Sequence, residues 1–360
     1  MPGRFCPNKP VPKKVNPLLT RPREGWADAL RTFAILAVVL LHCAALNIGG
    51  ELPGGTRFWV INLIDGGVRW GVPVFVMLSG AFLLDPEKEM TTRQWLARVG
   101  RIALLTVFWG AVYALYDARG AHMGLEWLLE GLISLVTCRL HYHLWFLPML
   151  LGLYLLLPLF RALVRGAERK TLWLAVGLWA AALALDKLFA FAPTLPGQGW
   201  FEALDLGHLF GYGGYLILGY LLRTCEIHPK RAYCLYAAGA LGLLVTWGGT
   251  YLASVAAGQF AVGLYSYFVP NVSVTAAAVF LLARHLGLGR HPVWRQFSAL
   301  SLGVFILHPL FIDLTRALSF PSDAWNLALS IPLRCLTVTA LALAAAWLIR
   351  KLPGARKLIA

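Results

Sequence analysis

Charged side chains are scarce in this sequence. Only 14% of its 360 residues are Asp, Glu, Lys or Arg, whereas 59% are hydrophobic, and the mean hydropathy is +0.66. So little polar surface cannot cover a water-soluble globule. The short alternating segments of a β-barrel are lacking too, while apolar runs of roughly 20 residues recur along the chain. We therefore predict an all-α polytopic membrane protein.

Cysteine is sparse as well, and its spacing indicates neither a disulfide framework nor a metal site. The six cysteines are scattered, and no two of them form a Cys-x-x-Cys pair. We accordingly expect neither a disulfide nor a bound metal. The first apolar stretch begins near Ala29, already carries Asp28 and Arg31, and is not followed by a convincing small-residue cleavage site. A retained first helix is therefore expected rather than a cleaved signal peptide.

Hydropathy predicts about ten transmembrane helices. They are expected at residues 28–47, 68–84, 100–116, 143–160, 171–189, 205–222, 232–254, 262–283, 297–317 and 326–349. Between the first two, residues 51–65 contain Gly and Pro and are expected to form an outer loop. Residues 117–142 are too polar to cross a membrane, but Glu126 and Glu130 share one face of an amphipathic segment, which predicts an outer interfacial helix.

The positions of Lys and Arg predict the orientation of the chain. A net charge of +15 would suit nucleic-acid binding in a soluble protein, but in a membrane protein the location of the charges matters more, and we expect no nucleic-acid partner. With the N-terminus inside, 25 of the 32 basic residues lie on the inner side, and the other seven are Arg57, Arg69, Arg119, Arg139, Lys187, Arg316 and Arg334. Both termini are therefore expected in the cytoplasm, with a basic leader at 1–25, a membrane domain at 26–350 and a basic tail at 351–360.

After Asp28 at its start, the first predicted span carries Arg31 and His42 in an otherwise apolar stretch. Eleven residues of helix separate them by roughly 16 Å along the axis. An ionisable residue inside a membrane is costly, so a functional role for His42 is favoured over a structural hydrogen bond. A neutral imidazole can take a proton from a hydroxyl group or can itself accept an acyl group. Arg31 can form a simple ion pair with Asp28, three residues away, or can point inward to an anionic group such as phosphate.

The other candidate residues each have a plainer interpretation. Arg93, Arg98 and Arg101 precede the third span, where the positive-inside bias alone predicts basic residues, although three arginines without a lysine favour phosphate binding. Ser79-Gly80 in the second span indicates close helix packing or a thin wall beside a substrate tunnel. On the outer side, Trp145 is typical of an aromatic belt, and the neighbouring His143 would suit binding of an acceptor. His308 lies inside the ninth span, just before Pro309, which leaves an upstream carbonyl without its helical donor.

Together these motifs resemble the integral-membrane acyltransferase 3 family, which O-acylates surface polysaccharides, lipopolysaccharide and similar glycans. The resemblance extends over residues 26–350, and its motifs occur in the family's order: Asp28-x-x-Arg31 followed by His42, Phe75–Leu83 with its Ser-Gly pair, the three arginines before the third span, His143-Leu-Trp-Phe-Leu, and Leu302–Pro309.

The resemblance implies a donor, a catalytic residue and an acceptor. The donor would be acetyl-CoA or another acyl-CoA bound from the cytoplasm, with its phosphates held by arginines. The catalytic residue would be His42, and the acceptor hydroxyl would arrive from the outer side. Some family members carry a fused extracytoplasmic esterase-like domain; this chain shows none, so we expect it to complete the transfer itself or to hand the acyl group to a partner such as a polysaccharide-assembly protein.

The leading hypothesis is therefore an acyl-CoA-dependent glycan O-acyltransferase of a bacterial inner membrane. Arg31, Arg93, Arg98, Arg101 and Ser79 would bind the donor, His42 would catalyse, and His143, Trp145 and His308 would bind the acceptor. A secondary transporter or flippase for a glycan or anion is the main alternative, although the sequence shows no duplicated halves. A scaffold for polysaccharide assembly is a third hypothesis. Spacing leaves the acid partner of His42 open between Asp65, Asp205 and Asp313.

Overall fold

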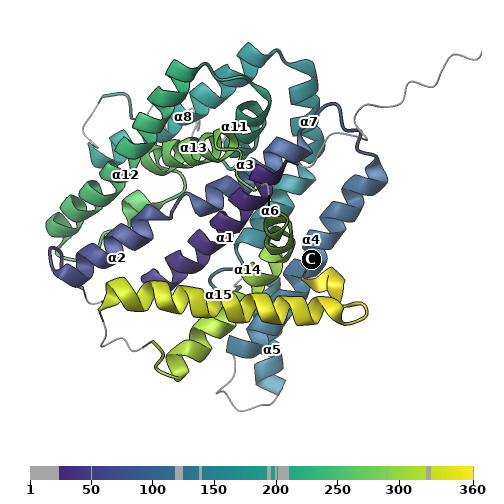
Figure 1. The fold of residues 1–360 in the computed structure, drawn as a ribbon, viewed down its shortest axis with the longest axis vertical. Helices are drawn as coiled ribbons and strands as arrows, with labels where there is room; N and C mark the ends of the chain where they lie inside the picture. The colour runs from purple at the N-terminus through teal and green to yellow at the C-terminus, as the bar shows by residue number, and fades with distance from the viewer. Residues whose placement is uncertain are drawn as a thin grey trace, which may run out of the picture.

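A computed structural model describes residues 24–49, 51–117, 125–137, 140–192, 196–198, 201, 211–289, 291–321 and 326–359. Most of the predicted basic leader lies outside these ranges. The described residues form helices and no strands, which confirms the all-α class (Figure 1). The helices are α1 (Gly25–Ala45), α2 (Thr56–Gly67), α3 (Gly71–Leu83), α4 (Thr92–Asp117), α5 (Leu125–Val136), α6 (Phe146–Leu155), α7 (Leu157–Gly166), α8 (Arg169–Phe191), α11 (Gly213–Thr224), α12 (Pro229–Ala257), α13 (Pro270–His285), α14 (Val293–Ala317) and α15 (Leu327–Lys351), with short 3-10 turns η2 (Gly263–Tyr265) and η3 (Ala355–Leu358).

Within the described ranges, eight helices are long and apolar enough to cross a membrane, or nine if the bent pair α6 and α7 counts as one span. The predicted span at 205–222 is only partly described, as α11. Pro158 explains the 50° bend between α6 and α7, because proline lacks the amide hydrogen that would continue the helix. The predicted outer amphipathic segment is helical, as α5.

One sequence-based expectation is wrong. Residues 51–65 were expected to form a loop, but the chain is helical from Thr56, and α2 and α3 together make one 28-residue span. Within residues 51–65, Gly and Pro occur only at positions 53–55. The apolar side chains that follow, including the buried Phe58 and Ile61, favour a helix that packs on its neighbours. The two helices are separated at residues 68–70, between Gly67 and a proline in the first turn of α3, Pro73.

Helix α1 is the central helix of the bundle. In its most apolar window 72% of the residues are buried, against 22% in α8 and in α12. It contributes to both hydrophobic clusters of the core: Trp26 and Leu30 pack with α3, α11 and α13, while Val38 and Val39 pack with α4, α14 and α15. The residues carried by α1 are therefore surrounded by protein, which is where a membrane protein places functional polar groups.

Helices α3 and α11 pack backbone against backbone. A Cβ atom added to Gly80 would overlap the Leu216 backbone, and one added to Gly219 would overlap the Met77 backbone. Small residues of this kind let transmembrane helices approach closely. In the Ser79-Gly80 pair, Gly80 therefore allows the close packing of α3 against α11.

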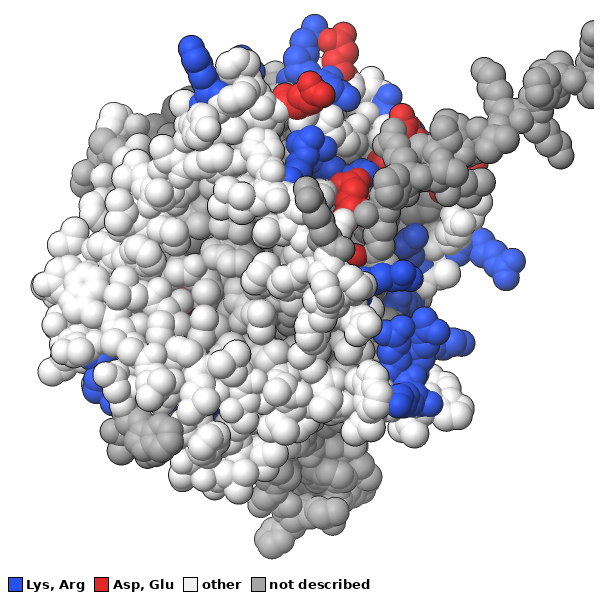
Figure 2. Space-filling view, in the orientation of Figure 1, with Lys and Arg blue, Asp and Glu red and all other residues white. Residues whose placement is uncertain are grey.

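Charge is distributed unevenly over the molecule. Figure 2 shows Lys and Arg gathered along the upper and right-hand edge, the side on which α4 begins and the described chain ends, while most of the left-hand surface is uncharged. The N-terminal end of α1, with Arg31, faces this basic side, and its other end, with His42, is directed away from it (Figure 1).

Candidate functional site

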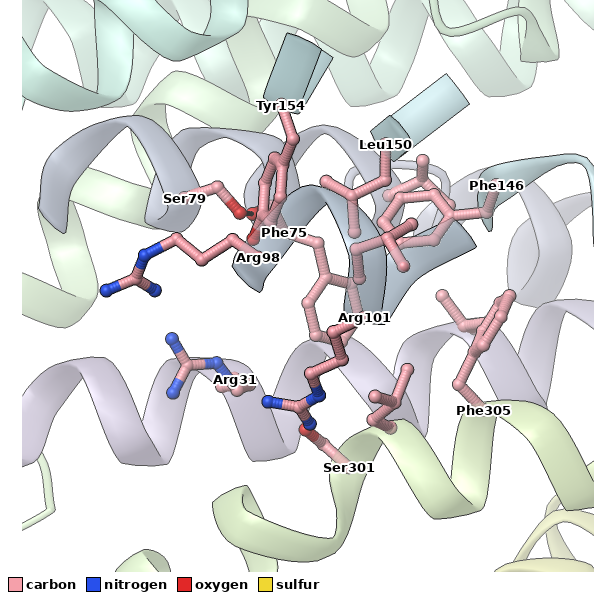
Figure 3. Close-up of a pocket in the computed structure, with 14 residues that line it drawn as sticks. Arg31, Phe75, Ser79, Arg98, Arg101, Phe146, Leu150, Tyr154, Ser301 and Phe305 are labelled. Carbon is pink, nitrogen blue, oxygen red and sulfur yellow. Dashed lines mark hydrogen bonds between the residues drawn. The ribbon is translucent and has the colours of Figure 1, made fainter. Parts of the chain in front are cut away.

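A cavity of about 250 Å³ lies between α1, α3, α4, α6 and α14. We call it the arginine cavity, because Arg31, Arg98 and Arg101 line it. Figure 3 shows their guanidinium groups gathered on one side, and Phe146 and Phe305 on the other. The cavity is therefore cationic at one end and apolar at the other, which suits an elongated ligand with an anionic group and an apolar or neutral arm.

A short hydrogen-bond network positions Arg31. The Ser298 hydroxyl accepts a bond from Arg31 Nη1 (3.1 Å) and donates one to Asp28 Oδ1 (2.8 Å). Arg31 also forms an ion pair with Asp28, with Nη1 and Oδ1 3.7 Å apart. Arg31 was interpreted either as the partner of Asp28 or as an inward-pointing group for an anion. The two are compatible, because the side chain is paired with Asp28 and still lines the cavity, with 31% of its side-chain surface exposed.

Ser79 and Tyr154 line the same cavity beside Arg98 (Figure 3). The Ser79 hydroxyl donates to the Phe75 carbonyl at 3.0 Å. The Tyr154 carbonyl lies four residues before Pro158, which has no amide hydrogen to offer it. The indole of Trp95 donates to that carbonyl instead, at 2.7 Å, and so fixes α4 against the bend after α6. Tyr154 is a cavity residue that the sequence did not indicate.

A second and more polar cavity of about 740 Å³ adjoins the first and shares Arg98 and Arg101 with it. Its other polar lining residues are Lys88, Gln94 and Arg161 and the carboxylates Glu87 and Glu89. Arg93 is exposed at the start of α4 and lines neither cavity. Of the three arginines singled out before the third span, the structure therefore brings Arg98 and Arg101 together with Arg31 and leaves Arg93 outside.

The apolar end of the arginine cavity abuts a group of histidines. Phe146 and Phe305, whose ring centroids are 5.3 Å apart, line the cavity, and Phe305 also contacts His143 at 5.4 Å and His308 at 6.1 Å. Val38, another lining residue, precedes His42 by one turn on the same face of α1. Two phenylalanine rings thus form the wall between the cavity and the histidines.

Four imidazole rings form what we call the histidine cluster: His42, His308, His143 and His141. The ring centroids of His42 and His308 are 5.2 Å apart, those of His308 and His143 are 5.4 Å apart, and those of His143 and His141 are 5.3 Å apart. The predicted residues His42, His143 and His308 are thus brought together from α1, the turn before α6, and α14. The sequence reasoning missed His141, although its spacing from His143 across one residue was visible.

Proline sets the hydrogen bonding of His308. Because Pro309 has no amide hydrogen, the Phe305 carbonyl four residues earlier lacks its helical donor. His308 Nδ1 lies 2.7 Å from that carbonyl oxygen, so Nδ1 carries the hydrogen and Nε2 presents its lone pair. Nε2 is buried and has no hydrogen-bond partner among the described residues, as is true of both ring nitrogens of His143. The cluster therefore offers buried nitrogen atoms that are available to a bound substrate.

Two aromatic side chains neighbour His143 in the chain: Tyr142, which packs on His42 of the histidine cluster, and Trp145, two residues further on. The Trp145 ring stacks between Tyr212 (6.1 Å) and Tyr267 (5.8 Å) and is 38% exposed, and Tyr142 lies 5.0 Å from His42. Desolvation, followed by the nearby Asp313 carboxylate, raises the pKa of the Tyr142 phenol, which therefore remains a hydrogen-bond donor. Exposed aromatic faces beside hydroxyl donors can hold a sugar ring.

Asp65, Asp205 and Asp313 were the candidate acid partners of His42. Asp65 forms an ion pair with Arg69 at 2.6 Å, Asp313 accepts a hydrogen bond from Tyr116 at 2.8 Å, and Asp205 lies outside the described residues. Among the described residues no hydrogen bond joins a carboxylate to His42. The carboxylate that does bond to the histidine cluster belongs to Asp117, which was missed because 117–142 was taken as an outer polar segment.

No group of three or more His, Cys, Asp or Glu side chains in the described part of the chain is arranged to hold a metal ion.

Comparisons with known proteins bear on this geometry. Residues 24–351 match the family model of the acyltransferase 3 family, which is described as an acyltransferase domain. The chain is also 26% identical over 309 residues to the serine/alanine racemase of Enterococcus gallinarum, in an alignment that covers 81% of this chain and 41% of that protein. The chain thus spans less than half the length of this curated relative. No solved structure matches it. Because the family model covers nearly all of the chain, the protein belongs to the acyltransferase 3 family.

Proposed function

We propose that the protein moves an acetyl or other short acyl group from cytoplasmic acyl-CoA to a sugar hydroxyl of an exopolysaccharide or lipid-linked surface glycan in a bacterial inner membrane. The observation that carries the proposal is the juxtaposition of an arginine-lined cavity and a histidine cluster across a wall of two phenylalanine rings. A donor with phosphates at one end and a thioester at the other fits that order of groups.

The two cavities suit the two parts of acyl-CoA. The larger and more polar cavity, with Lys88, Gln94 and the shared Arg98 and Arg101, would hold the nucleotide and its phosphates. The arginine cavity, with Arg31 and Ser79 near its mouth and an apolar far end, would hold the pantetheine arm. The positive-inside rule supports delivery from the cytoplasm, because this end of the molecule is the basic one (Figure 2).

The length of the donor agrees with the spacing of the residues on α1. Arg31 and His42 belong to one uninterrupted helix, which separates them by roughly 16 Å along its axis. The pantetheine arm has about twelve bonds between its phosphate oxygen and its sulfur, the equivalent of about four extended peptide residues, or roughly 14 Å. A diphosphate held at Arg31 therefore lets the thioester reach the neighbourhood of His42.

The chemistry would take place at the histidine cluster. His42 would remove the proton of the acceptor hydroxyl as its oxygen attacks the acyl carbon, or would first accept the acyl group itself. The acceptor would approach from the side of Trp145 and His143, with His308 next to both His143 and His42. Polysaccharide-assembly proteins are the partners that such an acceptor implies.

The proposal is tested by supplying radiolabelled acetyl-CoA to bacterial membranes that contain the protein and their own glycans. We expect the label to appear in the glycan as an alkali-labile ester. His42→Ala is expected to reduce the rate by about a hundredfold to ten-thousandfold, the usual contribution of a positioned acid or base, while acetyl-CoA binding is kept. Membranes in which His42→Ala labels the glycan as fast as the wild type would refute the role of His42, and label that never enters glycan would refute the acceptor.

A further inference from the structure

The histidine cluster ends in an ion pair that places a carboxylate at its far edge. Both Asp117 carboxylate oxygens lie 2.9 Å from His141 Nδ1. Since a carboxylate only accepts, Nδ1 carries the hydrogen and His141 Nε2 presents a lone pair. Nε2 is buried and has no hydrogen-bond partner among the described residues. The His141 side chain is 11% exposed and that of Asp117 48%, so the pair joins the buried cluster to solvent.

The pair is held firmly in this orientation. The His141 ring stacks on Tyr113, with centroids 4.6 Å apart and planes within 27°. Tyr113 is fully buried, and its hydroxyl donates to the Ile306 carbonyl of α14 at 2.6 Å. Asp117 is the last residue of α4, the helix that also carries Tyr113. The His141 end of the histidine cluster is thus held in place by both α4 and α14.

Within the described ranges, no carboxylate is hydrogen-bonded directly to His42, which would gain from one as a base. In a base assisted by an acid, the carboxylate stabilises the imidazolium that forms when the base takes a proton. Asp65 is already paired with Arg69, at 2.6 Å, whereas Asp117 is hydrogen-bonded to the cluster itself. Successive rings of the cluster are 5.2–5.4 Å apart, so a modest rotation of an imidazole brings its nitrogen within hydrogen-bond reach of the next.

We propose that Asp117, acting through His141, is the carboxylate of a four-histidine proton relay that stabilises the charge formed at His42. The inference rests on the proposed function. As the acceptor oxygen bonds to the acyl carbon, its O–H bond breaks and His42 takes the proton. Because His308 Nδ1 stays bonded to the Phe305 carbonyl, His308 Nε2 both receives the proton from His42 and passes it to His143. From His143 the proton reaches His141 Nε2, so that the imidazolium formed there is paired with Asp117. The C–S bond breaks with its electron pair on sulfur, and the proton returns through the row to that sulfur, so that free thiol leaves. Asp117 is a positioning residue, since its carboxylate is hydrogen-bonded to His141 and acts on His42 through that ring.

Asp117→Asn tests the relay, because asparagine keeps an oxygen that accepts the hydrogen of His141 Nδ1 but has no charge. We expect kcat to fall about tenfold to a hundredfold, less than for a fully buried triad carboxylate, with the KM for acetyl-CoA unchanged. Asp117→Glu restores the charge and is expected to recover most of the loss. The matched control is Asp186→Asn, which removes a carboxylate of similar exposure (50%) from an ion pair with Lys187, and it is expected to keep wild-type kcat.

A second variant guards against misfolding. His141→Gln keeps a side-chain amide that can donate to Asp117 but interrupts the relay, and its kcat is expected to fall as far as that of Asp117→Asn. Wild-type kcat in Asp117→Asn or in His141→Gln, or an equal loss in Asp117→Asn and Asp117→Glu, would overturn the inference. These results leave the proposed function standing as long as the wild-type protein labels the glycan and His42→Ala is inactive. Failure of the wild-type protein to label the glycan would refute the proposed function itself.

Discussion

Replacing Arg98 by Ala should weaken the binding of acyl-CoA. Arg98 lines both cavities, so its guanidinium group stands where the nucleotide and the pantetheine arm of the donor would meet. A hydrogen bond to a charged group contributes about 1.5–3 kcal/mol. The Arg98 side chain is exposed to solvent, which favours the lower end of that range. A loss of about 1.5 kcal/mol corresponds to roughly a tenfold increase in Kd.

The assay is calorimetric titration of the detergent-purified protein with acetyl-CoA at two salt concentrations. Arg93→Ala is the matched control, because it removes the same charge from the same helix but lies outside both cavities. We expect wild-type Kd in that variant. Added salt should weaken wild-type binding more than that of Arg98→Ala, since the variant has one cation fewer to screen.

Three results would contradict this prediction. Unchanged affinity in Arg98→Ala would show that the phosphates do not reach Arg98. Equal weakening by Arg93→Ala would show that the arginines act through overall charge rather than through the cavities. Failure of the wild-type protein to bind millimolar acetyl-CoA would exclude acyl-CoA as the donor.

Two further predictions concern packing and the position of Arg31. Gly80→Ala should lower the thermal unfolding temperature, because its new Cβ atom overlaps the backbone of α11 and overpacking costs about 1–3 kcal/mol. Gly100→Ala is the control and should not lower it, because a Cβ atom at Gly100 would meet no atom within 4 Å. An unchanged melting curve for Gly80→Ala would contradict the close packing of α3 and α11. Ser298→Ala removes the hydroxyl that holds Arg31, so the Kd for acetyl-CoA should increase about threefold to tenfold, and the same affinity as wild type would show that Arg31 needs no such support.

Much of the architecture follows from the sequence. Apolar runs and the positions of Arg and Lys predict a bundle of membrane-spanning helices, because lipid leaves the backbone no other partners than its own. Pro309 and His308 show that local chemistry can be predicted as well: the carbonyl freed by the proline was expected, and in the structure it accepts from His308. The α2 segment failed because Gly and Pro at its start were given more weight than the apolar residues after Thr56.

The site itself was only partly predictable. Motif spacing pointed to Arg31 and His42, but which arginines meet in one cavity depends on how α4 packs, and that packing excludes Arg93. Asp117 and His141 were missed for a related reason. They are 24 residues apart in a segment too polar to span the membrane. Their contact depends on how the chain folds back between them, which the sequence pattern does not predict.

In the proposed reaction the donor enters at the basic end of the molecule and the acyl group leaves at the other end. This direction of transfer is tested most directly with sealed vesicles of both orientations, each given labelled acetyl-CoA only on its outer surface. The account predicts alkali-labile glycan label in inside-out vesicles, whose cytoplasmic face is exposed, and none in right-side-out vesicles. Equal labelling in both, or labelling in right-side-out vesicles alone, would contradict it.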